Sequence, residues 1–231
     1  MRKFLIASAL VPVLLAAAGS QAADKPAAQA ASIPTASAAP VPAGAYTLDK
    51  AHASLLFRVN HITFSHWTAR FTKFDAQLQF DPTDPAKSSV KVTVDPKSIA
   101  ADNVPDGFLT TLAGPEWLDA GKYPEMTYRS TKVERSGANG LRISGQLTLH
   151  GVTKPVTLVG TYNGGYAGHP YDPHARVGFS AKGTLKRSEF GVAYGIPAPG
   201  TTMGVFDDVE VIIEAEFSGP PLPGAAAPAK Q

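Results

Sequence analysis

Apolar and polar side chains alternate along most of this chain, and this period of two constrains the possible fold more than any other feature. Leu55, Phe57 and Val59 fall on one face of an extended segment, opposite Arg58 and Asn60. Such alternation is typical of strands that turn one face to an apolar interior and the other to water. The same pattern recurs in segments 74–80, 90–94, 126–130, 143–149, 156–162, 177–181 and 209–217.

Short turns separate these segments and predict antiparallel pairing. Examples are Asp81–Pro85, Ser136–Gly140 and Asn163–Gly165, which are rich in Gly, Pro, Asn and Asp. We therefore expect an all-β fold of about eight antiparallel strands, either closed as a barrel or stacked as a two-sheet sandwich. The stretch between the first two segments is expected to be a long turn. Segments 106–112 and 116–120 predict one or two short inserted helices.

The two ends of the chain differ in composition from the middle. Residues 1–22 carry a basic start, a mostly apolar run and the sequence Ser20-Gln21-Ala22, which is the pattern of a cleavable signal peptide. Residues 23–44, rich in Ala and Pro, and the tail 219–231 are predicted to be disordered. We expect one domain over 45–218, exported to the periplasm, with no stable membrane insertion after cleavage.

Charge and cysteine content exclude several classes of function. Loss of Arg2 and Lys3 with the signal peptide reduces the 21 basic residues to 19, which equals the 19 acidic residues. No basic block stands out, so a nucleic-acid partner is not expected. The chain has no cysteine, which removes thiolate metal sites, cysteine nucleophiles and disulfides.

No motif for catalysis or cofactor binding is found, and we expect neither an enzyme nor a cofactor. His52 and His61 are too far apart along one extended strand to share a metal ion. The cluster of His169, Asp172 and His174 lies in a loop rich in Gly and Pro and is interpreted as solvated rather than metal-binding.

Several motifs, in order, resemble the YceI-like family. They are Tyr46-Thr-Leu-Asp-Lys-Ala-His-Ala-Ser-Leu-Leu-Phe57, Arg70-Phe-Thr-Lys-Phe74, Trp117-Leu-Asp-Ala-Gly-Lys-Tyr-Pro124, Leu147-Thr-Leu-His-Gly-Val-Thr-Lys-Pro155, Lys186-Arg-Ser-Glu-Phe-Gly191 and Asp207-Asp-Val-Glu-Val211. The resemblance covers residues 46–217. It implies an eight-stranded, lipocalin-like periplasmic barrel that binds polyisoprenoids or similar amphiphilic lipids, often as a homodimer.

The chain departs from the family pattern at three places. Ala69 and Asp75 stand where the family usually has Gly, and an Arg-Asp-x-His-Leu stretch is here Pro105-Asp-Gly-Phe-Leu109. If the missing Arg and His contact a ligand headgroup in the family, the headgroup bound here differs.

A lipid carrier needs an apolar lumen and a polar site for the headgroup. The residues expected in the lumen wall are Phe57, Val59, Phe71, Phe74, Tyr128, Leu147, Phe179 and Phe190. His61, Ser65 and Arg187 are the headgroup candidates, although the same side chains could instead brace strand ends. Two other functions stay open: a non-catalytic structural or stress-response protein with a filled core, and a lipid-modifying enzyme that uses His61.

Overall fold

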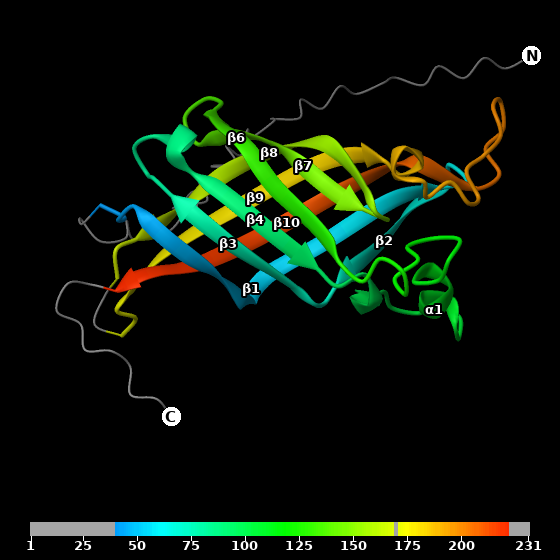
Figure 1. Cartoon of the computed structure of the whole chain (residues 1–231), viewed down its shortest axis with the longest axis horizontal. Coiled ribbons are helices and arrows are strands. Elements are labelled where there is room, and N and C mark those ends of the chain that lie inside the picture. The colour runs from blue at the N-terminus through cyan, green and yellow to red at the C-terminus, as the bar shows by residue number, and fades with distance from the viewer. Residues whose placement is uncertain (1–39, 169–170, 222–231) are drawn as a thin grey trace, which may run out of the picture. The chain divides into compact units, whose positions relative to one another are not determined.

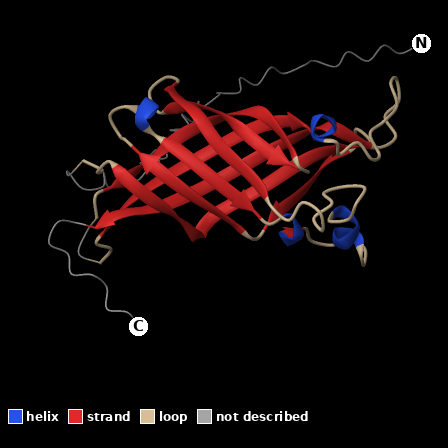
Figure 2. Ribbon diagram, in the orientation of Figure 1, coloured by secondary structure: helices blue, strands red, loops and turns tan. Residues whose placement is uncertain are grey.

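The computed structural model describes residues 40–168 and 171–221, and all ten strands in this part of the chain belong to one antiparallel sheet (Figures 1 and 2). One short α-helix, α1 (Phe108–Leu112), and three 3-10 helices (Pro85–Lys87, Pro96–Ser98 and Arg187–Phe190) interrupt it. The strands are β1 (Gly44–His61), β2 (Ser65–Phe71), β3 (Phe74–Phe80), β4 (Ser89–Val94), β5 (Ile99–Ala100), β6 (Met126–Arg135), β7 (Gly140–Leu149), β8 (Val152–Tyr166), β9 (His174–Lys186) and β10 (Val205–Pro221).

Eight of the strands close into a barrel, which confirms the predicted fold class. The ring runs β1-β10-β9-β8-β7-β6-β4-β3, and β3 returns to pair with β1. These eight strands contain the eight segments in which the sequence alternates. The sandwich alternative is excluded because the pairing of β1 with both β10 and β3 leaves no free edge in the ring.

The alternation along β10 shows why the sheet closes around an apolar interior. Val209, Val211 and Ile213 point into the lumen. Between them, Glu210 points outward and accepts a hydrogen bond of 2.9 Å from Nε of Arg58 on β1. Apolar burial on one face and ion pairing on the other therefore fix the register of the two strands.

The long first strand serves two neighbours on the same edge. Residues 44–47 pair with β3, and residues 56–61 pair with β2, which in turn pairs with β5. The long turn expected between residues 61 and 74 is thus corrected: a short turn after His61 leads into the strand β2, which pairs with β1 as a hairpin. Trp67, Ala69 and Phe71 do alternate there, but the segment is short and otherwise polar, so the signal was weak.

Residues 101–125 follow β5 and carry α1, which confirms one inserted helix. The second expected helix, 116–120, is wrong: these residues form turns in which the amide of Asp119 bonds to the carbonyl oxygen of Gly114 at 2.8 Å. A cluster of Ala69, Ile99 and Leu112 packs this segment against the β2–β5 extension. The segment also forms part of the lumen wall, to which it contributes Phe108, Leu112, Trp117 and Leu118.

Order extends beyond both expected domain boundaries. Val41 packs against the buried cluster around Tyr46, and the Tyr46 hydroxyl donates a 2.7 Å hydrogen bond to the carbonyl oxygen of Pro42. β10 continues to Pro221, three residues into the segment predicted to be disordered. The predicted signal peptide, most of the predicted linker and residues 222–231 lie outside the described residues. Within residues 40–168 and 171–221, no helix has the length and apolar character needed to cross a bilayer.

Candidate functional site

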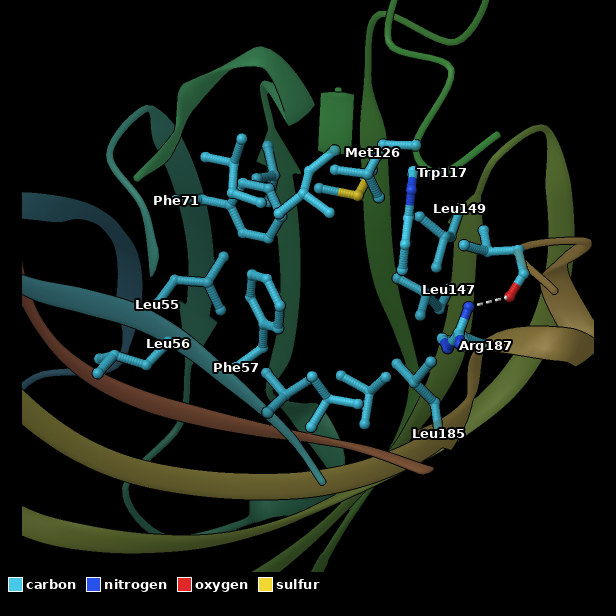
Figure 3. A pocket seen from close by; sticks show the side chains of 18 of the residues that line it. Leu55, Leu56, Phe57, Phe71, Trp117, Met126, Leu147, Leu149, Leu185 and Arg187 are labelled. Atoms are coloured by element: carbon cyan, nitrogen blue, oxygen red, sulfur yellow. Dashed lines mark hydrogen bonds between the residues drawn. The ribbon is translucent and has the colours of Figure 1, made fainter. Parts of the chain in front are cut away.

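The barrel interior contains an apolar cavity of about 420 Å³ (Figure 3). In the close-up, Phe57 and Phe71 face Leu147 and Leu149 across the space, and Trp117 lies along one side. Val59, Tyr128 and Leu147 also line it, so five of the eight expected lumen residues meet in this one cavity. The volume lies in the range typical of small-molecule sites.

A second cavity of about 340 Å³ continues the lumen toward the amino-terminal end of β1. Phe74 and Phe179, two more expected lumen residues, line this second cavity and not the first. The two cavities share five wall residues: Leu55, Val92, Tyr128, Leu158 and Ile213. They therefore lie in series along the barrel and meet at this shared ring.

Tyr128 occupies the junction of the two cavities. Its hydroxyl donates a 2.9 Å hydrogen bond to the carbonyl oxygen of Ile143, and burial raises the pKa of Tyr128 to about 12. The ring packs over Gly145, where a Cβ would come within 2.4 Å of it. Gly145 thus lets the tyrosine lie against the wall with its hydroxyl satisfied, which keeps this polar group from protruding unpaired into the lumen.

His61 and Ser65 form the polar end of the first cavity. His61 ends β1, Ser65 begins β2, and both side chains line the cavity while remaining exposed to solvent. A cavity wall that is also exposed marks a place where the lumen communicates with the surface. The two side chains offer an imidazole and a hydroxyl there, so the structure brings these two headgroup candidates together.

Arg187, the third headgroup candidate, is buried beneath the first cavity and is largely occupied. Its Nη1 donates to the carbonyl oxygens of Val192 (3.0 Å) and Tyr194 (2.8 Å). Its Nη2 donates to Val205 (2.7 Å) and its Nε to Phe206 (3.1 Å). These contacts describe the bracing alternative: the guanidinium clamps both ends of the loop 191–204, and burial lowers the pKa of Arg187.

Trp117 lies against the same guanidinium. The Cζ atom of Arg187 is 5.2 Å from the centre of the Trp117 ring, which also contacts the ring of Tyr194 edge-on at 5.4 Å. Segment 101–125 is therefore attached to Arg187 through a cation–π contact and to loop 191–204 through an aromatic contact.

The expected lumen position of Phe190 is corrected to a core position. Phe190 is fully buried in a cluster with Val94, Met126 and Leu149, and it lines neither of the two cavities. It lies on a 3-10 helix after the end of β9, so the inward face of a strand does not determine its direction.

Several residues that line the first cavity are not among the eight expected lumen residues. Trp67 comes from the unexpected strand β2, and Phe108, Leu112 and Trp117 come from the segment 101–125. The alternation around Trp67 is too short to predict a strand, and no periodicity marks the three positions in segment 101–125. The only available signal was the presence of large apolar side chains in a segment that otherwise resembles a surface loop.

One polar cluster outside the lumen is engaged in ion pairs. The side-chain atoms of Asp49, His52 and Glu216 that could bind a metal ion lie within 4.8 Å of one another. Arg176 also donates to Asp49, and this contact lowers the pKa of Asp49 to about 2. Of the loop cluster His169, Asp172 and His174, the first residue lies outside the described residues.

Sequence comparison finds relatives over most of the chain. A model of the YceI-like domain matches residues 46–217. A UPF0312 protein of Vibrio parahaemolyticus is 33% identical over 216 residues, which cover 93% of this chain and 98% of the relative. A UPF0312 protein of Vibrio cholerae is 36% identical over 154 residues, 65% of this chain and 78% of the relative.

Solved structures share the barrel. BcnA of Burkholderia cenocepacia superposes with a TM-score of 0.63 at 27% identity, over 73% of this chain and 98% of that one. A polyisoprenoid-binding domain from Saccharophagus degradans has a TM-score of 0.53 at 14% identity, over 76% and 98%, and shows the common fold alone. The matched domain, the relatives and the closed eight-stranded barrel agree, and the chain belongs to the YceI-like family.

Proposed function

We propose that this protein is a periplasmic carrier that holds the tail of an isoprenoid or similar long-chain amphiphile in the barrel lumen and does not change it chemically. The observation that carries the proposal is the pair of apolar cavities in series, which share one ring of wall residues. A slim chain fits such a lumen better than a compact ligand does. The polyisoprenoid-binding domain that shares the fold supports the same class of ligand.

Burial of the tail supplies the free energy for binding. Each methylene moved from water into the lumen gains about 0.8 kcal/mol. Ordering a flexible chain offsets part of this gain, so the affinity is smaller than the buried area alone implies. A lumen that contains vacant apolar space also argues against the filled-core alternative, in which side chains would occupy the interior.

The headgroup is proposed to lie at the solvent-exposed end of the first cavity. His61 and Ser65 can offer hydrogen bonds there to a phosphate, quinone or amide oxygen. Arg187 lies deeper and contributes mainly positive potential, since four of its N–H groups already bond to carbonyl oxygens. The family also implies a homodimer, which remains a prediction that sedimentation can test.

The lumen can be blocked by filling the ring that the two cavities share. Leu158 lies in that ring, whereas the next residue on β8, Val159, points to solvent. Leu158→Trp should weaken binding of a polyprenyl phosphate by at least about tenfold, because the indole occupies space needed by the tail. Val159→Trp, the matched control, should bind like the wild type.

Titration of delipidated protein with polyprenyl phosphates, isoprenoid quinones and fatty acyl amides checks this prediction. Equal affinity in the two tryptophan variants, or no saturable binding of any of these lipids by the wild type, would contradict the proposal. The bound lipid is then extracted, and its mass is measured by mass spectrometry. Recovery of a chemically altered lipid, prevented by His61→Ala, would favour the enzyme alternative.

A further inference from the structure

Exposed apolar side chains gather at the same end of the barrel as His61 and Ser65. Five large apolar side chains of the described residues are strongly exposed, and three of them lie there: Phe64 (83%), Met203 (78%) and Tyr194 (52%). Phe64 lies in the turn between β1 and β2, which we call the hairpin tip (residues 61–65). Tyr194 and Met203 lie in loop 191–204, which we call the rim loop.

The hairpin tip and the rim loop form one surface. The amide of Ile62 donates a 3.0 Å hydrogen bond to the carbonyl oxygen of Gly204, which joins the two segments directly. Figure 1 shows both segments at the end of the barrel that also carries α1. The exposed side chains of Phe64 and Met203 therefore project from neighbouring pieces of backbone.

Both segments are held in a fixed shape. In the hairpin tip, the amide of Phe64 bonds to the carbonyl oxygen of His61 at 3.0 Å, and the amide of Thr63 bonds to Oδ1 of Asn60 at 2.8 Å. The rim loop is clamped at both ends by Arg187, as described above. The apolar side chains are thus presented outward by built structure and cannot easily fold back onto the barrel.

The surface carries almost no charge. Residues 59–69 and 190–206 contain no Asp, Glu, Lys or Arg, and only His61 and His66 can become charged. Charged residues are the most costly to bring into the interfacial layer of a bilayer, whereas Phe, Tyr and Met enter it readily. The nearby segment 101–125 contains more acidic than basic residues, which disfavours contact with an anionic surface.

The surface is continuous with the lumen. The first cavity is lined by His61 and Ser65 from the hairpin tip and by Val205, which follows the rim loop. An object seated on this surface therefore meets the exposed end of the cavity. Since an isoprenoid tail is held in membranes rather than in water, the object that matches both the apolar surface and the cavity is a lipid bilayer.

We propose that the hairpin tip and the rim loop dock the barrel on the interfacial layer of a membrane with zwitterionic lipid, so that a lipid tail enters the lumen without crossing water. This inference rests on the proposed lipid-carrier function for its purpose. Phe64 and Met203 supply the apolar contact, and the Arg187 clamp keeps the rim loop in position. Docking is weak and reversible because only a few side chains enter the bilayer.

Flotation of the mature full-length protein with phosphatidylcholine vesicles tests the proposal. The double variant Phe64→Ser/Met203→Ser should lower the vesicle-bound fraction by about tenfold, since two large apolar contacts are removed. Val159→Ser, which removes an exposed apolar side chain elsewhere, should leave it unchanged. Addition of phosphatidylglycerol should not increase binding of the wild type.

Several results would overturn the docking proposal. They are absence of wild-type flotation, equal flotation of the double variant, or flotation only with anionic lipid. A wild-type dimer that the double variant converts to a monomer, without vesicle binding by either, would assign the surface to a second copy of the chain.

A separate readout distinguishes failure of docking from failure of the carrier function. The double variant should still bind a polyprenyl phosphate supplied in detergent micelles, because both substituted side chains lie outside the two cavities. Flotation without any lumen binding would leave docking intact and reject the carrier role. Lumen binding without flotation would do the reverse.

Discussion

Arg187 shows how the sequence can leave the role of a single polar residue open. A guanidinium is well suited to phosphate, but the same side chain could instead brace strand ends. The structure directs four of its N–H groups to carbonyl oxygens at positions 192, 194, 205 and 206. Two of those partners lie in irregular chain and two at the start of β10, as many as 19 residues away, and no local pattern reveals such contacts.

Substitution of Arg187 separates bracing from headgroup binding. Arg187→Met should lower the free energy of unfolding by about 3 kcal/mol, because buried carbonyl groups lose charged donors. Arg187→Lys should recover little of this loss, since one ammonium cannot span four carbonyl oxygens. Urea denaturation measures the free energy of unfolding of both variants. Arg142→Met, on the exposed face of β7, is the control.

A different outcome would restore the headgroup role. Normal stability in both variants, with affinity for a polyprenyl phosphate lost in Arg187→Met and kept in Arg187→Lys, would show that the charge serves the ligand. The brace would then be dispensable.

At the scale of elements, strands with clear alternation were predictable and irregular segments were not. β1, β3 and β10 follow from the period of two, because a half-buried strand must separate its faces. β5 has two residues and offers no pattern at all. The turns at 116–120 were mistaken for a helix. Helical composition does not reveal that the amides of Trp117 and Asp119 both bond to the carbonyl oxygen of Gly114 instead.

An ion pair between β1 and β9 makes the stability of the barrel depend on pH. Arg176 on β9 bonds to Asp49 on β1 and holds the pKa of Asp49 at about 2, below the ordinary value of 3.8. A carboxylate with a lowered native pKa stabilises the fold fully above about pH 4, and this contribution disappears as the pH falls through about 2.

Asp49→Asn should therefore lower the free energy of unfolding by about 1 kcal/mol at pH 6, the size expected for a partly exposed pair. The difference from the wild type should shrink between pH 4 and pH 2. Urea denaturation across this range measures it, and the exposed Asp102→Asn is the control. A difference that is constant with pH would contradict the assignment to this ion pair.

At the scale of the whole barrel, the sequence indicates which side chains face inward but not whether they fill the interior. Seven of the eight expected lumen residues line the two cavities, because inward direction follows from strand alternation. The vacant volume depends on how eight strands close and on which side chains meet across the lumen. Segments 101–125 and 191–204 also shape the cavity, and neither has a hydrophobic periodicity from which its structure could be predicted.

The most direct test of the account is a crystal structure of the protein saturated with a polyprenyl phosphate. We predict continuous density for the tail that runs through the first cavity, past Tyr128, into the second, with the phosphate beside His61 and Ser65. Density for the lipid on the outer surface, with both cavities vacant or filled by water, would contradict the central claim that the lumen is the binding site.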